Sequence, residues 1–175
     1  MQRPQSEVSD HTVSWLDHLA DDRAIAELRT CCAANTWAHA MVGARPFGSL
    51  ESLLDTGEAA VLKMDDDALG QALAAHARIG EHASGAGREA GWSRTEQADV
   101  LAADGDVAAL LVEGNDAYEQ RFGHIFLIRA AGRSAQEIYD AMQDRLANDE
   151  TTERTVVRRE LADIVRLRLT KLVSQ

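Results

Sequence analysis

The scarcity of proline is the feature that most restricts the fold of this chain. Its 175 residues contain only Pro4 and Pro46, so residues 47–175 contain no proline. Proline inside a helix removes a backbone hydrogen bond and clashes with the preceding turn, so its absence permits long helices. Apolar residues also recur at steps of three and four along most of the chain. We therefore predict an all-α fold, a single compact helical domain with one short extended segment near Ile125.

The helical spacing and the turn signals divide the chain into elements. The expected helices cover residues 24–34, 36–44, 49–62, 67–75, a stretch beginning at 93, 106–121, 134–146 and 151–173. Ser134 and Glu137 have the spacing of a capping box, in which each side chain binds the backbone amide of the other residue. The apolar run from Ile125 to Ile128 predicts either a buried strand or extended chain. We expect residues 1–10 to form a polar tail and residues 11–175 to form the helical domain.

The charge of the chain excludes two classes of partner. Lys and Arg number 18 against 29 Asp and Glu, which gives a net charge of −11. Nucleic-acid binding requires a basic surface, and so does binding to an anionic membrane, so we predict neither. No apolar run approaches the length of about 18 residues that would span a bilayer. The segment from Met1 to Ser9 is polar, so we expect no signal peptide.

The two cysteines indicate the compartment. Cys31 and Cys32 are adjacent, and a disulfide between neighbours strains the peptide that joins them. A disulfide framework is therefore excluded, and the pattern favours the reducing cytoplasm.

The last predicted helix carries a charged residue on its apolar face. Val157, Leu161 and Ile164 define this face, and at about 100° per residue Arg168 lies only about 20° from Val157. Arg166 lies about 180° away, on the side expected to face solvent. A buried guanidinium needs an anionic partner. Arg168 therefore pairs with a buried acidic side chain, extends its charged end to solvent, or binds a carboxylate of a ligand.

His76 ends the apolar face of its predicted helix, three residues after Leu73, and borders a glycine-rich loop over residues 78–91. Long loops inside compact domains are often functional. The loop contains no phosphate-binding glycine motif. Imidazole exchanges protons near neutral pH, so His76 is either a structural residue at a helix end or a proton-transfer group.

The sequence Ser93-Arg94-Thr95-Glu96 also has capping-box spacing, which predicts that a helix begins at Ser93. The free amides of a helix N-terminus bind anions, so capping and ligand binding are compatible here.

Metal and nucleophile patterns are weak. The six histidines show no recognised metal-ligand spacing, so we predict no metal site. His76 and His82, with Glu81 between them, keep a metal hydrolase as an alternative. The chain has no Gly-x-Ser-x-Gly elbow, and Cys32 has no partner motif, so the sequence gives little support to nucleophilic hydrolysis.

Several motifs stand in a specific order along residues 19–172. They are Cys31-Cys32, Trp37, Met41, Arg45-Pro46-Phe47, His76 to Glu81, Trp92 to Ala98, Asn115 through Tyr118 to Gly123, Ile125 to Ile128, Gly132 to Ala135, Arg145 to Asp149, and Leu167 to Leu169. Together they resemble the OHCU decarboxylases, where OHCU is 2-oxo-4-hydroxy-4-carboxy-5-ureidoimidazoline.

The resemblance implies a fold, a reaction and a setting. The family is all-α and homodimeric, and it acts in urate degradation after urate oxidase and 5-hydroxyisourate hydrolase, to which this chain would be functionally coupled. It converts OHCU to (S)-allantoin and CO2 without a metal or an organic cofactor. The substrate is a small molecule, and its ring C=N and carbonyl groups serve as the electron sink that a cofactor would otherwise supply.

The resemblance also implies roles for individual residues. His76 corresponds to the catalytic histidine, Glu96 to its supporting carboxylate and Arg168 to a site arginine near the C-terminus. The implied substrate contacts are Ala77, Ser93, Arg94, Thr95, Glu96, Gln97, Phe126, Leu127, Ile128, Arg129 and Ala130. Proline is usual in the family at the position of Ala77. Alanine in its place frees a backbone amide and loosens the chain after His76.

These assignments lead to a mechanistic hypothesis. His76 donates the proton to the carbanion-like intermediate, and Glu96 orients and stabilises the imidazolium. In the alternative division, one of the two groups deprotonates the substrate hydroxyl while the other protonates carbon. Arg168 and the amides near Ser93 hold polar groups of the substrate. The competing class is a helical dimerisation or adaptor module that has lost catalysis, with Ala77 as its sign.

Overall fold

The structure of the chain, a computed structural model, describes residues 13–103 and 105–175. The predicted polar tail, residues 1–10, lies outside this range. The described residues form two compact units. The N-terminal unit contains residues 13–71 and 162–175, and the central unit contains Ala72–Leu161.

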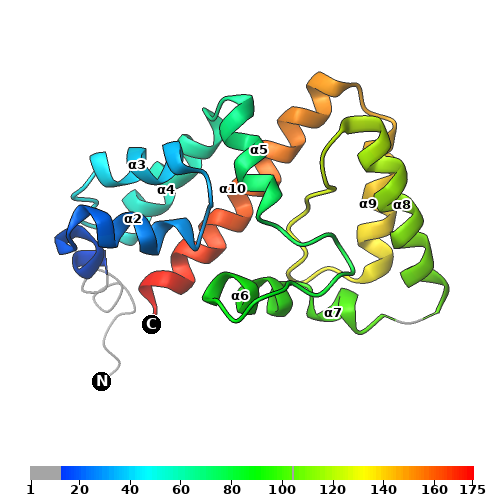
Figure 1. Cartoon of the computed structure of the whole chain (residues 1–175), viewed down its shortest axis with the longest axis horizontal. Coiled ribbons are helices and arrows are strands. Elements are labelled where there is room, and N and C mark those ends of the chain that lie inside the picture. The colour runs from blue at the N-terminus through cyan, green and yellow to red at the C-terminus, as the bar shows by residue number, and fades with distance from the viewer. Residues whose placement is uncertain (1–12, 104) are drawn as a thin grey trace. The chain divides into compact units, whose positions relative to one another are not determined.

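The all-α prediction is confirmed, because the described residues contain helices and no strand. Residues 13–18 are helical, and the further helices are α2 (Asp21–Arg29), α3 (Asn35–Gly43), α4 (Leu50–Leu62), α5 (Asp66–Ala74), α6 (Arg88–Glu96), α7 (Ala98–Leu101), α8 (Asp106–Phe122), α9 (Ala135–Leu146) and α10 (Glu150–Val173) (Figure 1). Along the described residues, no helix combines the length and apolarity needed to cross a bilayer.

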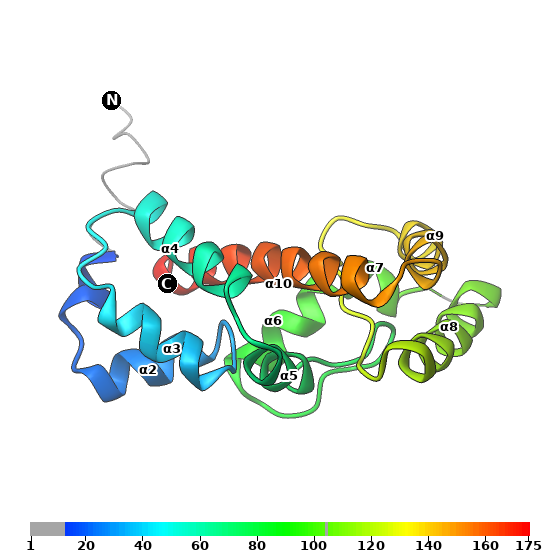
Figure 2. The same ribbon diagram turned by 90° about the horizontal axis from the view of Figure 1, so that it is seen from above.

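In the N-terminal unit, α3 packs against both α2 and α4 (Figure 2). Trp37 is buried and its indole Nε1 donates a hydrogen bond of 3.1 Å to the carbonyl oxygen of Gly57 on α4. A Cβ at Gly57 would lie 2.6 Å from Leu169 Cδ1, so any other residue would have to displace the buried Leu169 side chain where α4 approaches the C-terminal part of α10.

In the central unit, α8 and α9 lie side by side (Figure 1). Here Gly114 has the role that Gly57 has in the other unit, because a Cβ on it would lie 2.3 Å from Met142 Sδ. The buried cluster of this unit draws residues from helices and from coil, namely Ile79, Val100, Leu111, Tyr118, Phe126, Ile128, Ala130, Ala135, Ile138 and Met142.

One predicted helix start is wrong. α6 begins at Arg88 with Gly87 as its N-cap, and Ser93 lies well inside the helix. The Ser93 carbonyl accepts an intrahelical bond of 3.0 Å from the Gln97 amide, and the Ser93 side chain is buried. Ser-x-x-Glu spacing also fits a helix interior, and the single Gly91 was not enough to stop the helix, since one glycine costs only about 1 kcal/mol.

The segment from Gly123 to Ser134 is the predicted interruption. It contains neither helix nor strand, and it follows α8, whose C-cap residue Gly123 has a left-handed φ of 75°. The predicted capping box at its end is confirmed: the Glu137 amide donates to Ser134 Oγ at 3.2 Å, and the Ser134 amide donates to Glu137 Oε2 at 2.7 Å. We call residues 125–130 the anchored segment.

Candidate active site

His76 and Ala77 stand immediately after the end of α5. The His76 amide donates a hydrogen bond of 3.0 Å to the Leu73 carbonyl, which closes the last turn, and both side chains are half-buried. The coil from 75 to 87, called here the His76 loop, then leads to α6. His76 therefore has the position that the sequence predicted, at the junction of a helix and the glycine-rich loop.

Two of the predicted substrate contacts on α6 and just after it bind the backbone of the His76 loop. Gln97 Oε1 accepts a hydrogen bond of 3.0 Å from the Gly80 amide, while its Nε2 donates to the Arg78 carbonyl at 3.5 Å. Arg94 Nη1 donates to the carbonyls of Ala83 at 3.0 Å and Gly85 at 3.2 Å. These side chains fix the loop relative to α6.

A second set of contacts holds the His76 loop from α8. Arg78 forms ion pairs with Asp116 at 2.6 Å, Glu119 at 2.7 Å and, within the loop, Glu81 at 3.3 Å. The hydrogen bond to Asp116 is the main reason that the pKa of Arg78 is raised above its usual range. Arg78 and its α8 partners are not among the site residues predicted from the sequence, since nothing local signals a pair 38 or 41 positions apart.

Asn115 completes the attachment to α8. Its Nδ2 donates a hydrogen bond of 2.9 Å to the Ile79 carbonyl, and the side chain is buried. Its Oδ1 is a buried acceptor without a hydrogen-bond partner among the described residues.

The remaining α6 candidates lie on one helical turn. Glu96 is half-buried at the last position of the helix, and Thr95 is exposed, with its hydroxyl donating to the Gly91 carbonyl at 3.1 Å. Because Ser93 is interior to α6, the predicted anion-binding amides of a helix N-terminus at Ser93 are wrong. Any contact made from this turn comes from side chains.

The anchored segment contains the other five predicted substrate contacts. Phe126, Leu127, Ile128 and Ala130 are buried, and Arg129 is exposed. Three of the buried side chains belong to the same apolar cluster as Ile79 of the His76 loop. The structure therefore brings the loop and the anchored segment together over one core, although 46 residues of sequence lie between Ile79 and Phe126.

Arg168 lies in the N-terminal unit. It is 6 % exposed, which confirms the burial that its helical position predicted. Cys32 lies near it: burial raises the pKa of the Cys32 thiol to about 11, and the positive charge of Arg168 opposes that rise. A thiol so strongly protonated at neutral pH is a poor nucleophile.

The prediction for Arg166 is only half right. Its side chain is 33 % exposed, but it forms ion pairs with Asp55 at 2.9 Å and Glu58 at 2.8 Å on α4. The hydrogen bond to Asp55 is the main cause that raises the pKa of Arg166. The side of α10 opposite its apolar face thus meets an acidic helix surface rather than water alone.

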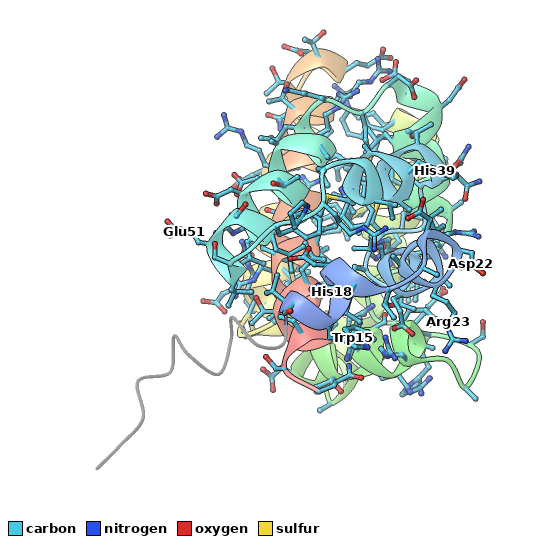
Figure 3. All side chains as sticks on the ribbon, turned by 90° about the vertical axis from the view of Figure 1, so that its left-hand side faces the viewer. Trp15, His18, Asp22, Arg23, His39 and Glu51 are labelled. Carbon is cyan, nitrogen blue, oxygen red and sulfur yellow. The ribbon has the colours of Figure 1, made fainter. Side chains whose placement is uncertain are left out.

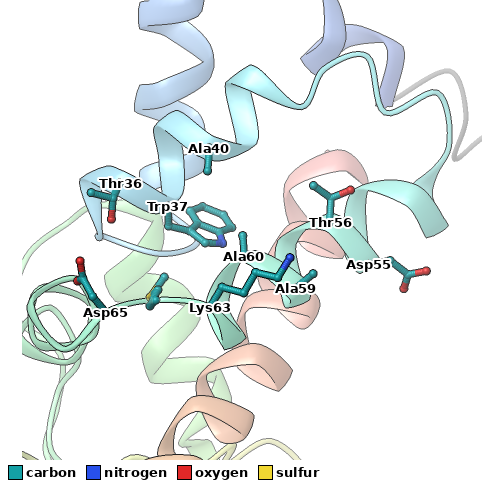
Figure 4. Close-up of a pocket in the computed structure, with 10 residues that line it drawn as sticks. Thr36, Trp37, Ala40, Asp55, Thr56, Ala59, Ala60, Lys63 and Asp65 are labelled. Carbon is teal, nitrogen blue, oxygen red and sulfur yellow. The ribbon is translucent and has the colours of Figure 1, made fainter.

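A cavity of about 670 Å³ lies in the N-terminal unit, at the surface formed by α3 and α4. Figure 4 shows Thr36, Trp37 and Ala40 on one side of it and Thr56 and Lys63 on the other. None of the predicted site residues lines this cavity.

Figure 3 shows His18 and His39 at the surface of the N-terminal unit, where both are exposed. No group of three or more His, Cys, Asp or Glu side chains suited to a metal ion occurs in the part of the chain that the structure describes.

Comparisons with known proteins connect this geometry to a family. The chain is 29% identical over 151 residues to the uric acid degradation bifunctional protein TTL of Arabidopsis thaliana. The match covers 85% of this chain and 47% of that protein, so the chain spans about half the length of its relative.

Two solved structures share the fold. A crystal structure of an OHCU decarboxylase in the presence of (S)-allantoin matches with a TM-score of 0.74 and 24% identity, over 90% of this chain and all of that one. A crystal structure of an (S)-allantoin synthase matches with a TM-score of 0.70 and 16% identity, over 91% of this chain and 53% of that one. At these identities the two structures support the fold.

The family itself is established by sequence. The sequence model of OHCU decarboxylase matches residues 17–170, a range that includes His76, Glu96 and Arg168. The match confirms the resemblance drawn from the motifs, and the chain belongs to the OHCU decarboxylase family.

Proposed function

We propose that this chain is a carboxy-lyase that converts OHCU to (S)-allantoin and CO2 in urate degradation. The observation that carries the proposal is the family match over residues 17–170, the range in which His76, Glu96 and Arg168 all lie. Among the relatives, one is named for uric acid degradation and another for (S)-allantoin synthesis. An adaptor without catalysis would have no chemical reason to keep these three side chains.

The reaction needs one bond cleavage and one proton. Breaking the bond between the ring carbon and its carboxylate releases CO2 and leaves an electron pair on that carbon. The ring C=N and carbonyl delocalise the pair, so no cofactor is required as an electron sink. The hydroxyl on the decarboxylated carbon becomes a carbonyl as its proton leaves, and the ring nitrogen of the former C=N is protonated. A further proton, delivered to one face of the neighbouring carbon that bears the ureido group, gives (S)-allantoin.

His76 is the proton donor in this proposal. It stands at the start of the His76 loop, whose backbone Gln97, Arg94 and Asn115 hold in place. A fixed backbone restricts the face from which the imidazole reaches the substrate, which is what a single stereochemical product requires. Glu96 is proposed to orient the imidazole and stabilise its charged form.

Substrate contacts are proposed from three parts of the chain. Ala77 is the contact next to His76, and the turn from Ser93 to Gln97 supplies polar side chains. The backbone from Phe126 to Ala130 binds the flat ring and ureido edges. Arg168 is proposed to bind a carboxylate or carbonyl of the substrate.

The setting is part of the proposal. We propose that the chain works as a homodimer in the cytoplasm, without metal or organic cofactor, and is coupled functionally to urate oxidase and 5-hydroxyisourate hydrolase. The bifunctional uric acid degradation relative, of which this chain matches 47%, supports such coupling.

The direct test starts from freshly generated OHCU. Urate oxidase and 5-hydroxyisourate hydrolase produce it from urate, and circular dichroism follows the appearance of optically active allantoin. We expect the wild-type chain to accelerate formation of the (S) form and to keep its activity after exhaustive chelation. His76→Ala should lower turnover by about 10² to 10⁴, the usual contribution of a general acid.

His82→Ala is the matched control, because His82 is an exposed histidine of the same loop. It should retain wild-type turnover. Loss of activity in both histidine variants, with restoration by zinc, would instead favour the metal hydrolase.

Arg168 is tested by separating stability from turnover. Arg168→Met keeps the apolar stem, so a ligand-binding role predicts a folded protein with weakened activity and partial rescue by Arg168→Lys. A structural role predicts loss of about 3–5 kcal/mol of unfolding free energy, because a buried acidic partner would be left alone. Arg159→Met on the exposed side of α10 is the control, since Arg166 pairs with α4.

A further inference from the structure

A buried ionic network lies in the central unit, outside the residues assigned to the reaction. Its centre is Arg145 on α9, which is 7 % exposed, and Glu153 on α10, which is fully buried. Arg145 Nε and Nη2 both contact Glu153 Oε1, at 2.7 and 2.6 Å. The Tyr118 hydroxyl donates to the same oxygen, and Asn148 Nδ2 donates to Glu153 Oε2 at 2.9 Å. The carboxylate is therefore fully bonded.

One hydrogen bond connects this network to the anchored segment. Arg145 Nη1 donates a hydrogen bond of 2.7 Å to the carbonyl of Leu127, in the anchored segment. The guanidinium also lies 4.4 Å from the centre of the Phe126 ring, which places a cation over an aromatic face. Arg145 thus holds both the backbone and a side chain of a segment that has no helix or sheet ladder to fix it.

A buried ion pair by itself adds little net stability to a fold. Desolvation of two charges offsets much of their attraction, and apolar replacements of similar size are often equally stable. Burial raises the pKa of the Tyr118 phenol, so the hydroxyl stays protonated and keeps donating to Glu153. What an apolar side chain at position 145 does not supply is a hydrogen bond to the Leu127 carbonyl.

A second hydrogen bond from a helix side chain reaches the anchored segment two residues after Leu127. The Arg129 amide donates to Glu160 Oε2 at 2.8 Å, so the two helix-derived anchors fall on residues 127 and 129. In the extended form that the sequence predicts for this segment, the N–H and C=O of one residue point to one edge and those of its neighbours to the other. The N–H and C=O groups of residues 126 and 128 then point away from the anchors, while the Ala130 carbonyl accepts a hydrogen bond of 3.0 Å from the Arg133 amide.

We infer that Arg145, held in place by Glu153 and Tyr118, is a positioning residue that fixes the anchored segment so that the opposite backbone edge binds the substrate. The inference rests on the proposed function, because the substrate of that edge is OHCU. Arg145 acts through the Leu127 carbonyl and the Phe126 ring and does not itself contact the substrate.

The test removes the network without leaving a buried charge. The triple variant Arg145→Met, Glu153→Met and Tyr118→Phe replaces all three polar groups by apolar ones of similar size. Three quantities are measured: the cooperativity of urea unfolding, hydrogen exchange of amides 125–130, and kcat and KM for OHCU. Arg145→Lys is measured in parallel, because it keeps the charge without the planar fork.

We expect the triple variant to unfold cooperatively, as the wild type does. Exchange in 125–130 should rise by about tenfold or more, the effect of losing a hydrogen bond to a charged group. The ratio kcat/KM should fall by about 10- to 100-fold, as displacements of positioning groups do. Arg145→Lys should recover part of both losses. The control pair Arg159→Met and Asp144→Met, two exposed residues with the same net charge change, should leave both readouts at wild-type values.

A folded triple variant with wild-type exchange in 125–130, or with wild-type kcat/KM, would overturn the inference. If the triple variant does not fold, the same two readouts on Arg145→Lys decide. A wild-type chain that makes no (S)-allantoin would overturn the proposed function, whereas an active wild type with an equally active triple variant overturns this inference alone.

Discussion

The His76 loop and the anchored segment are both held in place by arginine side chains, but the arginine ion pairs are partly exposed in the first region and buried in the second. Both are coil, and an arginine ion-paired to carboxylates is part of the framework that fixes each. Arg78, beside His76, is 26 % exposed and its carboxylate partners are 35 to 60 % exposed. Arg145 and Glu153 are 8 % and 1 % exposed in their side chains.

The difference in exposure sets the energetics of the two regions. Exposed ion pairs contribute about 0–1 kcal/mol and are screened by salt, whereas breaking a buried pair costs several times more. Removing the arginine of the exposed pairs beside the proposed proton donor is therefore expected to cost little, whereas removing the arginine of the buried pair at the anchored segment is expected to cost more. This comparison yields four predictions.

The largest effect is expected at the buried arginine. Arg145→Met alone leaves the buried Glu153 carboxylate without a positive partner, and we expect it to lower the free energy of unfolding by about 3–5 kcal/mol. Urea denaturation measures the change, with Arg159→Met as an exposed arginine control. A loss no greater than that of the control would show that the two regions do not differ in this way.

The exposed arginine should matter less and should respond to salt. Arg78→Met is expected to lower the free energy of unfolding by about 1 kcal/mol or less, because water already solvates its partners. The gap from wild type should shrink at high NaCl concentration, which screens exposed charges. Urea denaturation at low and high salt checks this, and a salt-independent loss would contradict it.

Restoring the family's proline should stabilise the His76 loop slightly. Ala77 lies outside α5, and proline there restricts the unfolded chain, so Ala77→Pro is expected to raise the free energy of unfolding by about 0.4–1 kcal/mol. Turnover should hold or improve. A joint fall of stability and turnover would show that this chain has adapted its site to Ala77.

The smallest effect is expected at acid pH, in the capping box of Ser134 and Glu137 that begins α9 after the anchored segment. The hydrogen bond from the Ser134 amide holds the pKa of Glu137 below its usual range. Glu137 therefore stabilises the fold above the ordinary carboxyl pKa, and this contribution is lost as pH falls through the lowered value. α6, which follows the His76 loop, has no side-chain cap.

The check is the melting temperature as a function of pH for wild type and Glu137→Gln. Glutamine keeps a hydrogen-bond acceptor without the charge, so the two curves should separate near neutral pH and converge at acid pH. Curves that stay parallel would contradict the assignment.

The helices were predictable because their signals are local. Spacing of apolar residues gave the long C-terminal helix, and Ser134 with Glu137 marked the start of α9 correctly. The same kind of pattern failed at Ser93, because Ser-x-x-Glu occurs inside helices as well as at their starts.

Of the buried charged residues Arg168, Glu153 and Arg145, the sequence pattern identified only Arg168. Arg168 was singled out by its place on the apolar face of its helix, and it is buried. Glu153 lies four residues before Val157 on that same face, and Arg145 follows Ile138 and Met142 at helical spacing. Glu153 and Arg145 thus lie on apolar helix faces, which is the signal that identified Arg168. That signal does not show that the two residues pair.

The sequence by itself determined the all-α fold, the family and the identity of the candidate residues, because periodicity, capping and motif order are properties of neighbouring positions. Tertiary structure alone decided which backbone groups those helices hold: Arg78 reaches α8, Gln97 reaches Gly80, and Arg145 reaches Leu127. These bonds join positions far apart in the chain, and their strength depends on burial. Burial arises only when the helices pack, so no local pattern contains it.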